Sequence, residues 1–222
     1  MGNPWLDLKK INGEYIAECD RGHVSSLKYD LAFDTLPWPY MGDPENAAVY
    51  VLSKSTIHKH ALEVGDGEQR EKAIMNNLAH SHPGRLPLLQ MDPEFNGTGF
   101  QEWWRDKLRY VIHETSEEAV ASFMFVAQYI PYSHKKKIDK PPELPSQKYT
   151  FALVRKAMAA GKTIVLMYPK REWYKAIPQL ESYEKCYTLL KPINGIENNN
   201  INGNGNFENI IQTIKKAQTD SC

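Results

Sequence analysis

The chain has few cysteines, no long apolar run and no net charge, and each of these absences excludes a class of protein. Its 222 residues include three cysteines, Cys19, Cys186 and Cys222, too few and too scattered for a disulfide framework, a zinc site or an iron–sulfur cluster. No segment approaches the roughly 20 consecutive apolar residues of a membrane span, and the N-terminus lacks the apolar core of a signal peptide. We therefore predict a cytoplasmic protein with no metal, no other cofactor and no membrane partner.

The balance of charge restricts how the chain can attract a polyanion. Lys and Arg together number 27 and so do Asp and Glu, which leaves a formal net charge of zero. Affinity for a nucleic acid must then come from local clusters of lysine and arginine, because no global basic field exists. With 41% apolar residues, the length fits one globular domain that spans residues 1–222.

Apolar runs alternate with helical patterns along the chain. Thr98 and Gln101 form a capping box before one helix, and Gly161 is a C-cap for another that begins after Ser146. Uninterrupted apolar strands separated by helices indicate a three-layer α/β fold around a central, mostly parallel, four-stranded sheet. The predicted strands are 48–52, 122–130, 162–167 and 186–190, and the predicted helices include 68–79, 148–160 and a closing helix after Asn206.

Four loops are expected to leave the same edge of this sheet. They are 53–60, 131–137, 168–172 and 191–206, each of which follows a predicted strand. Ligands of open parallel α/β sheets bind just beyond the carboxyl ends of the strands. A candidate site is therefore predicted where these loops converge.

The loop after the second strand is the most informative of the four. Tyr132 could provide a stacking surface, Ser133 and His134 hydrogen-bonding groups, and Lys135, Lys136 and Lys137 three positive charges, with Arg171 from the neighbouring loop. Such a set suits a nucleotide or a phosphate backbone. The alternative is a solvated run of charge.

The first loop, Ser53–His60, combines three hydroxyl groups, two lysines and two histidines. It has no glycine, so it is not a P-loop, and its alternative interpretation is also a solvated loop. His58 and His60 have no acidic or thiol partner at ligand spacing, which argues against a metal site. Adjacent residues such as Ser133 and His134 point apart in an extended loop, and the chain has no GxSxG motif, so a hydrolase triad is disfavoured.

The order of several short segments resembles the uracil-DNA glycosylase superfamily, in particular its uncharacterised bacterial and phage-type branches. The segments form an ordered series that spans about three quarters of the chain, and they are Tyr40–Leu52, Tyr129–His134, Leu144–Tyr149, Thr163–Met167 and Ile201–Asn206. The resemblance implies a pocket at the strand ends that holds a flipped base.

The residues that would carry glycosylase chemistry differ from the pattern of that superfamily. The acid or amide that positions the attacking water is replaced by Ser55, with His58 as the nearest base in sequence. Asn202 and Asn204 stand in the last loop in place of a His-Pro-Ser arrangement. A serine hydroxyl can orient water but is a poor general base at neutral pH.

Several functions remain open at this stage. One is a divergent glycosylase-like protein that binds DNA or a nucleotide, with weak or lost base excision. Another is an active DNA glycosylase that hydrolyses the N-glycosidic bond of uracil or a modified base. A third is a protein-binding module in phage–host conflict. Whether the chain is an enzyme is left undecided by its sequence.

Overall fold

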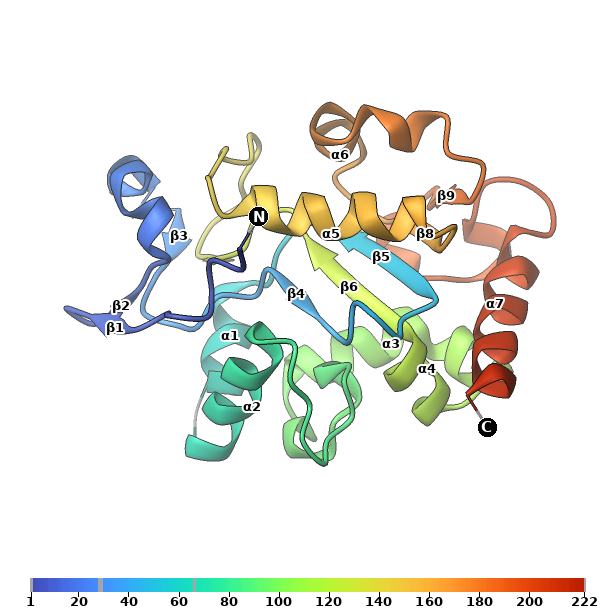
Figure 1. Cartoon of the computed structure of the whole chain (residues 1–222), viewed down its shortest axis with the longest axis horizontal. Coiled ribbons are helices and arrows are strands. Elements are labelled where there is room, and N and C mark those ends of the chain that lie inside the picture. Colours follow the sequence, from blue (N-terminus) through green and yellow to red (C-terminus); the bar gives the residue numbers. More distant parts are fainter. Residues whose placement is uncertain (1, 28–29, 66, 222) are drawn as a thin grey trace.

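The computed structural model describes residues 2–27, 30–65 and 67–221. A five-stranded sheet lies at its centre, in the order β4-β6-β5-β8-β9 (Figure 1). The bounds are β4 Tyr40–Met41, β5 Val49–Ser53, β6 Met124–Gln128, β8 Thr163–Leu166 and β9 Cys186–Thr188. The α/β class and the mostly parallel sheet are thereby confirmed.

The central strands form because they consist of apolar residues that are covered on both faces. Every residue of β5, β6 and β8 is buried. Val51 of β5 pairs in parallel with Val126 on one side and with Val165 on the other. Such near-continuous apolar runs are typical of parallel strands with helices above and below.

One strand of the sheet was not predicted. β4 runs antiparallel to β6, with Tyr40 opposite Ala127, so the expected four-stranded sheet has five strands in the described residues. The two-residue strand lies in a proline-rich approach that gives no periodic signal. The second strand is also shorter than predicted, because Phe123 ends a helix and the strand starts at Met124.

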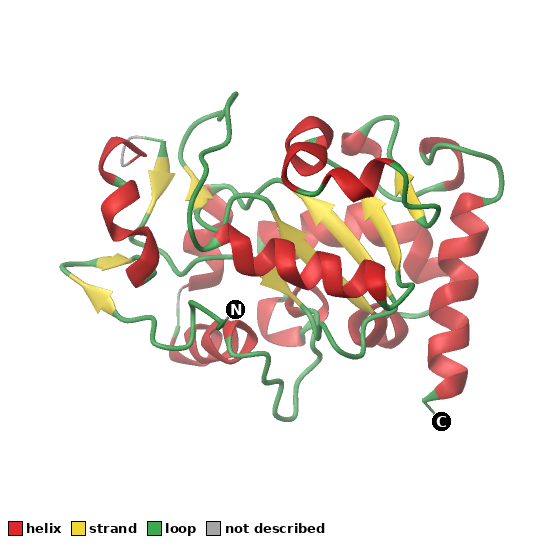
Figure 2. Ribbon diagram, turned by 45° about the horizontal axis from the view of Figure 1, so that its top comes forward, coloured by secondary structure: helices red, strands yellow, loops and turns green. Residues whose placement is uncertain are grey.

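Helices cover both faces of the sheet (Figures 1 and 2). α5 packs on β6 and β8, while α4 and α7 contact each other, α4 packing on β6 and α7 on β5. The helices are α1 His58–Gly65, α2 Glu68–Leu78, α3 Gly99–Glu114, α4 Glu117–Phe123, α5 Gln147–Ala159, α6 Lys170–Ala176 and α7 Asn206–Asp220. Short pairings β1 Lys10–Ile11 with β2 Glu14–Tyr15, and β3 Leu31–Ala32 with β7 Ser133–His134, lie outside the main sheet.

The ends of the helices follow the sequence signals with two exceptions. Thr98 caps α3, since its Oγ1 accepts a hydrogen bond from Gln101 N at 3.2 Å. Ser146 does precede α5, but its side chain makes no capping bond, and its backbone N–H donates to Asp20 instead. The first loop is shorter than expected because α1 begins at His58.

The strand order defines where a ligand site is expected. From β5 the chain crosses to β6 on one side, and after β6 it crosses back to β8 on the other side of β5. The carboxyl ends of β5 and β8 therefore border a topological switch point, where the connecting loops diverge and leave a crevice.

Candidate functional site

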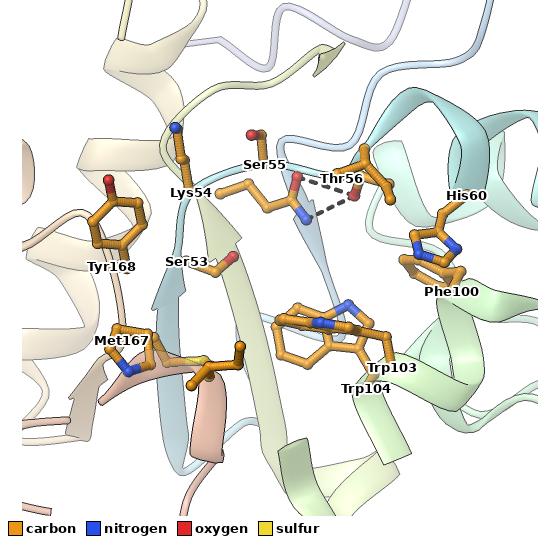
Figure 3. A pocket seen from close by; sticks show the side chains of 14 residues that line it. Ser53, Lys54, Ser55, Thr56, His60, Phe100, Trp103, Trp104, Met167 and Tyr168 are labelled. Atoms are coloured by element: carbon orange, nitrogen blue, oxygen red, sulfur yellow. Dashed lines mark hydrogen bonds between the residues drawn. The ribbon is translucent and has the colours of Figure 1, made fainter. Parts of the chain in front are cut away.

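A pocket of about 330 Å³ opens at this switch point (Figure 3). The ends of β5, β6 and β8 contribute to it, together with α3 and the loop after β9. Its lining residues are Ser53, Lys54, Ser55, Thr56, Ile57, His60, Phe100, Trp103, Trp104, Gln128, Met167, Tyr168, Pro192 and Ile193. We call it the aromatic pocket.

The walls of the aromatic pocket are flat and apolar. Tyr168 and Met167 lie on one side in Figure 3, with Trp103 and Trp104 on the other. The two indoles meet edge to face, with ring centroids 4.8 Å apart. Trp104 is 3% exposed and belongs to the core, whereas Trp103 is 42% exposed and lines the pocket with an accessible ring.

Three polar side chains lie at the strand ends between these walls. Gln128 Nε2 donates to Thr56 Oγ1 at 2.9 Å, and the same hydroxyl is 3.3 Å from Gln128 Oε1. Ser53 Oγ donates weakly to the Ala127 carbonyl at 3.5 Å. An amide has two N–H donors and two lone pairs, so Gln128 retains capacity for a polar ligand.

A second, strongly basic depression adjoins the aromatic pocket. It has a volume of about 600 Å³ and shares Lys54 and Ile57 with the pocket. We call it the lysine hollow, and its lining residues are Lys54, Ile57, His58, Lys59, Leu62, His134, Lys135, Lys136 and Lys137. The structure thus places the three consecutive lysines next to the aromatic pocket.

The two loops that build the lysine hollow are joined by backbone hydrogen bonds. The parallel pairing of β5 and β6 continues beyond the strands, because Tyr129 N donates to Ser53 O at 3.0 Å and Ile130 N to Lys54 O at 2.8 Å. An isolated parallel bridge then links Ile57 to His134. The expected convergence of loops 53–60 and 131–137 is confirmed.

The partner of Ser55 is His134 and not His58. Ser55 Oγ lies 3.0 Å from His134 Nδ1, at the border of the aromatic pocket and the lysine hollow. His58 starts α1 and faces Asp34, with 3.2 Å between Nε2 and Oδ1. Burial lowers the pKa of His134, and the positive charge of Lys54 lowers it further. The imidazole is therefore neutral at neutral pH.

Two residues predicted to bind the ligand belong to the core. Tyr132 is fully buried, its hydroxyl donates to Asp20 Oδ2 at 2.7 Å, and it accepts from Ala17 N at 3.1 Å. Ser133 is also fully buried and shares a 3.0 Å hydrogen bond with Thr35. The expectation that Tyr132 offers a stacking surface is wrong, because the N-terminal segment covers its ring.

The remaining predicted residues lie away from the aromatic pocket. Arg171 lines a separate depression beside α6, so it does not extend the lysine hollow. Asn202 Oδ1 accepts from Thr188 N at 2.7 Å and so holds the end of β9. Asn204 is exposed in the loop before α7 and lines neither cavity. The last loop instead contributes Pro192 and Ile193.

Sequence reasoning missed the aromatic and amide residues of the pocket. Gln128 and Tyr168 do stand at the ends of β6 and β8, a position that could have identified them. The sequence signal for Trp103 was weaker. Trp103 and Trp104 are adjacent, and only one of two adjacent residues on a helix can face the core fully.

The described ranges contain no cluster of three or more His, Cys, Asp or Glu residues that could hold a metal ion. Cys19 and Cys186 are free thiols, and Cys222 lies outside the described residues. None of the helices in these ranges combines the length and the apolar character of a bilayer span. Comparison with protein-family models, curated proteins and solved structures found no match for this chain.

Proposed function

We propose that this chain binds a nucleotide or a single strand of nucleic acid, with a base in the aromatic pocket and a phosphate in the lysine hollow. The proposal includes a uracil-DNA glycosylase-like scaffold with weak or lost base excision. A flat apolar slot beside a cationic surface is the combination by which proteins hold single strands, through base stacking and phosphate contacts.

The observation that carries the proposal is the continuity of the two cavities. Lys54 and Ile57 line both of them, so a ligand in the aromatic pocket extends directly towards Lys135, Lys136 and Lys137. On a chain of zero net charge, this cluster is a local source of attraction for phosphate. The site at a topological switch point adds support, since such crevices bind ligands across α/β folds.

The polar groups of the pocket favour binding over excision. None of the fourteen lining residues, all within the described ranges, carries a carboxylate that could accept a proton from water. Asn202, which would contact the base or backbone in an active glycosylase, is engaged with Thr188. These observations favour a glycosylase-like binding protein with weak or lost base excision over an active glycosylase.

The test is binding of a fluorescein-labelled, uracil-containing single-stranded oligonucleotide, followed by anisotropy over a range of salt concentrations. Replacing Lys135, Lys136 and Lys137 together by alanine should weaken binding at least about tenfold. The log–log salt slope should fall by up to about 2, at roughly 0.7 per phosphate contact. The matched control replaces Lys148, Lys215 and Lys216, three exposed lysines that line neither cavity, and should bind like the wild type.

Two outcomes would contradict the proposal. If the variant of Lys135–Lys137 has wild-type affinity and salt slope, these lysines are solvated surface residues that do not contact the ligand. A wild-type chain that binds neither oligonucleotides nor free nucleotides at low salt would favour a protein partner. Alkali cleavage of the same strand after incubation separates the alternatives, because nicking by the wild type that Ser55→Ala abolishes would indicate an active glycosylase.

A further inference from the structure

The border between the two cavities holds a hydroxyl group and an imidazole in hydrogen-bonding contact. Ser55 Oγ and His134 Nδ1 are 3.0 Å apart, although 79 positions separate the two residues in sequence. The distance of 3.0 Å between these two atoms lies within the range of roughly 2.6–3.2 Å in which a base can accept the proton of a nucleophile. The backbone hydrogen bonds that join the two loops hold the pair in place.

The environment of the pair favours proton transfer from serine to histidine. The lowered pKa of His134 keeps the imidazole neutral, and with its proton on Nε2 it offers Nδ1 as an acceptor. Its backbone is fixed as well, since His134 N donates to Thr56 O at 3.1 Å. In the described part of the chain no carboxylate forms an ion pair with His134, so the pair is a dyad.

The position of the dyad defines the substrate it can reach. Ser55 lines the aromatic pocket and His134 lines the lysine hollow. A molecule with a flat apolar group in the pocket and an anion in the hollow would therefore cross the border at which Ser55 and His134 meet. Lys54 lines both cavities and can place positive charge beside an oxyanion that forms there.

We propose that Ser55 is a nucleophile, with His134 as its general base, for the hydrolysis of carboxylic esters that join a flat apolar group to an anionic group. The inference uses the shape and charge of the two cavities and does not require that nucleic acid be the ligand.

The reaction proceeds in two halves. Ser55 Oγ bonds to the acyl carbon as its proton passes to His134 Nδ1, and the acyl C–O bond then breaks as the leaving alcohol takes that proton. Water next attacks the acyl-serine while His134 accepts a proton from it. The carboxylic acid is released, and Ser55 Oγ regains its proton from His134. No metal, oxidant or reductant is consumed.

The test compares an anionic with a neutral ester. 4-Nitrophenyl hydrogen succinate places a nitrophenyl ring in the pocket and a carboxylate in the hollow, and 4-nitrophenyl acetate lacks the anion. We expect a burst of nitrophenol and an acyl adduct on the peptide containing Ser55, seen by mass spectrometry. Ser55→Ala and His134→Gln should each lower the rate with both esters at least about tenfold, whereas Ser81→Ala, at an exposed serine that lines neither cavity, should not.

The lysines supply a second, independent readout. Replacing Lys135–Lys137 by alanine should raise KM for the succinate ester several-fold, and it should change KM for the acetate, which has no anion, much less. Wild-type rates in Ser55→Ala, or an adduct confined to lysine side chains, would overturn the inference. Because these assays contain no nucleic acid, they can succeed or fail independently of oligonucleotide binding.

Discussion

At the scale of single residues, exposure separates side chains that serve the site from those that serve the core. Tyr132 and Trp103 are both aromatic residues near the carboxyl edge of the sheet, yet the first is fully buried and the second is 42% exposed. The tyrosine hydroxyl donates a hydrogen bond to Asp20 and accepts one from the backbone N–H of Ala17. The tryptophan ring lines the aromatic pocket, and Lys107 Nζ lies 5.4 Å from its centroid.

Trp103→Ala should therefore weaken ligand binding without unfolding the protein. Loss of one stacked base costs about 1–3 kcal/mol of binding free energy, which anisotropy measures with the labelled single strand. Tyr110→Ala, a similarly exposed aromatic on the same helix outside the pocket, is the control and should bind normally. Trp104→Ala should instead lower the free energy of unfolding by about 3–5 kcal/mol, because it empties a core position. Equal affinities for the Trp103 variant and wild type would remove the stacking role.

At the scale of elements, the sequence predicted the strands and helices that have a regular pattern. The apolar runs that form β5, β6 and β8 and the spacing of Ile210, Ile211 and Ile214 in α7 are such patterns. β4 was missed because two residues are too few to show a period, and they form a strand only by pairing with β6. Their structure depends on a tertiary partner that local sequence does not reveal.

The candidate site was predictable only where it depends on the order of the strands and their loops. Loop order placed Ser55 and the lysines together, since carboxyl ends of parallel strands share an edge. The pairing of Ser55 with His134 depends on the backbone hydrogen bonds that join the two loops, and the burial of Tyr132 depends on how an N-terminal segment folds over the second loop. That packing joins residues more than 100 positions apart, for which no motif exists.

The end of α2 carries a group that makes stability depend on pH. His80 stacks on Tyr40 with ring centroids 4.6 Å apart, and its Nε2 is 2.9 Å from the Tyr149 hydroxyl. Burial and, to a smaller extent, the charge of the neighbouring His82 together lower the pKa of His80 to about 4. Between about pH 6.5 and pH 4 the unfolded chain therefore binds a proton that the folded chain does not, so stability falls as the pH is lowered through this window.

His80→Asn should flatten this acid-side loss, measured as the free energy of urea unfolding at pH 7 and at pH 4.5. Asparagine tolerates the left-handed backbone of this position, where φ is 54°. We expect the difference between the two pH values to shrink by roughly 1–2 kcal/mol after allowance for solvent screening. His113→Asn, at an exposed histidine of α3, is the control and should leave the difference unchanged. An unchanged difference in the His80 variant would assign the acid sensitivity to other groups.

At the scale of the whole molecule, one contiguous hydrophobic core connects the irregular N-terminal segment to the sheet. Trp5 and Trp38 belong to the same buried cluster as β5 and β6. Trp5 contacts the Tyr132 ring edge to face at 5.9 Å, and Trp38 N donates to the Pro131 carbonyl. The N-terminal segment is thus part of the wall behind the second loop of the site.

Unfolding should accordingly be one cooperative transition. Tryptophan fluorescence, which reports on Trp5 and Trp38 as well as on the sheet, and far-ultraviolet circular dichroism should give coincident urea curves. An early fluorescence transition that leaves the circular dichroism signal unchanged would show that the N-terminal segment unfolds separately.

The two outer strands of the main sheet are its shortest, with two residues in β4 and three in β9. Pro39 precedes β4, and beyond β9 the edge is closed by an antiparallel bridge between Leu189 and Ile201. A chain of zero net charge has little electrostatic repulsion to keep its copies apart. Blunted edges offer neighbouring molecules few free backbone groups to pair with, so they oppose aggregation by strand addition where charge does not.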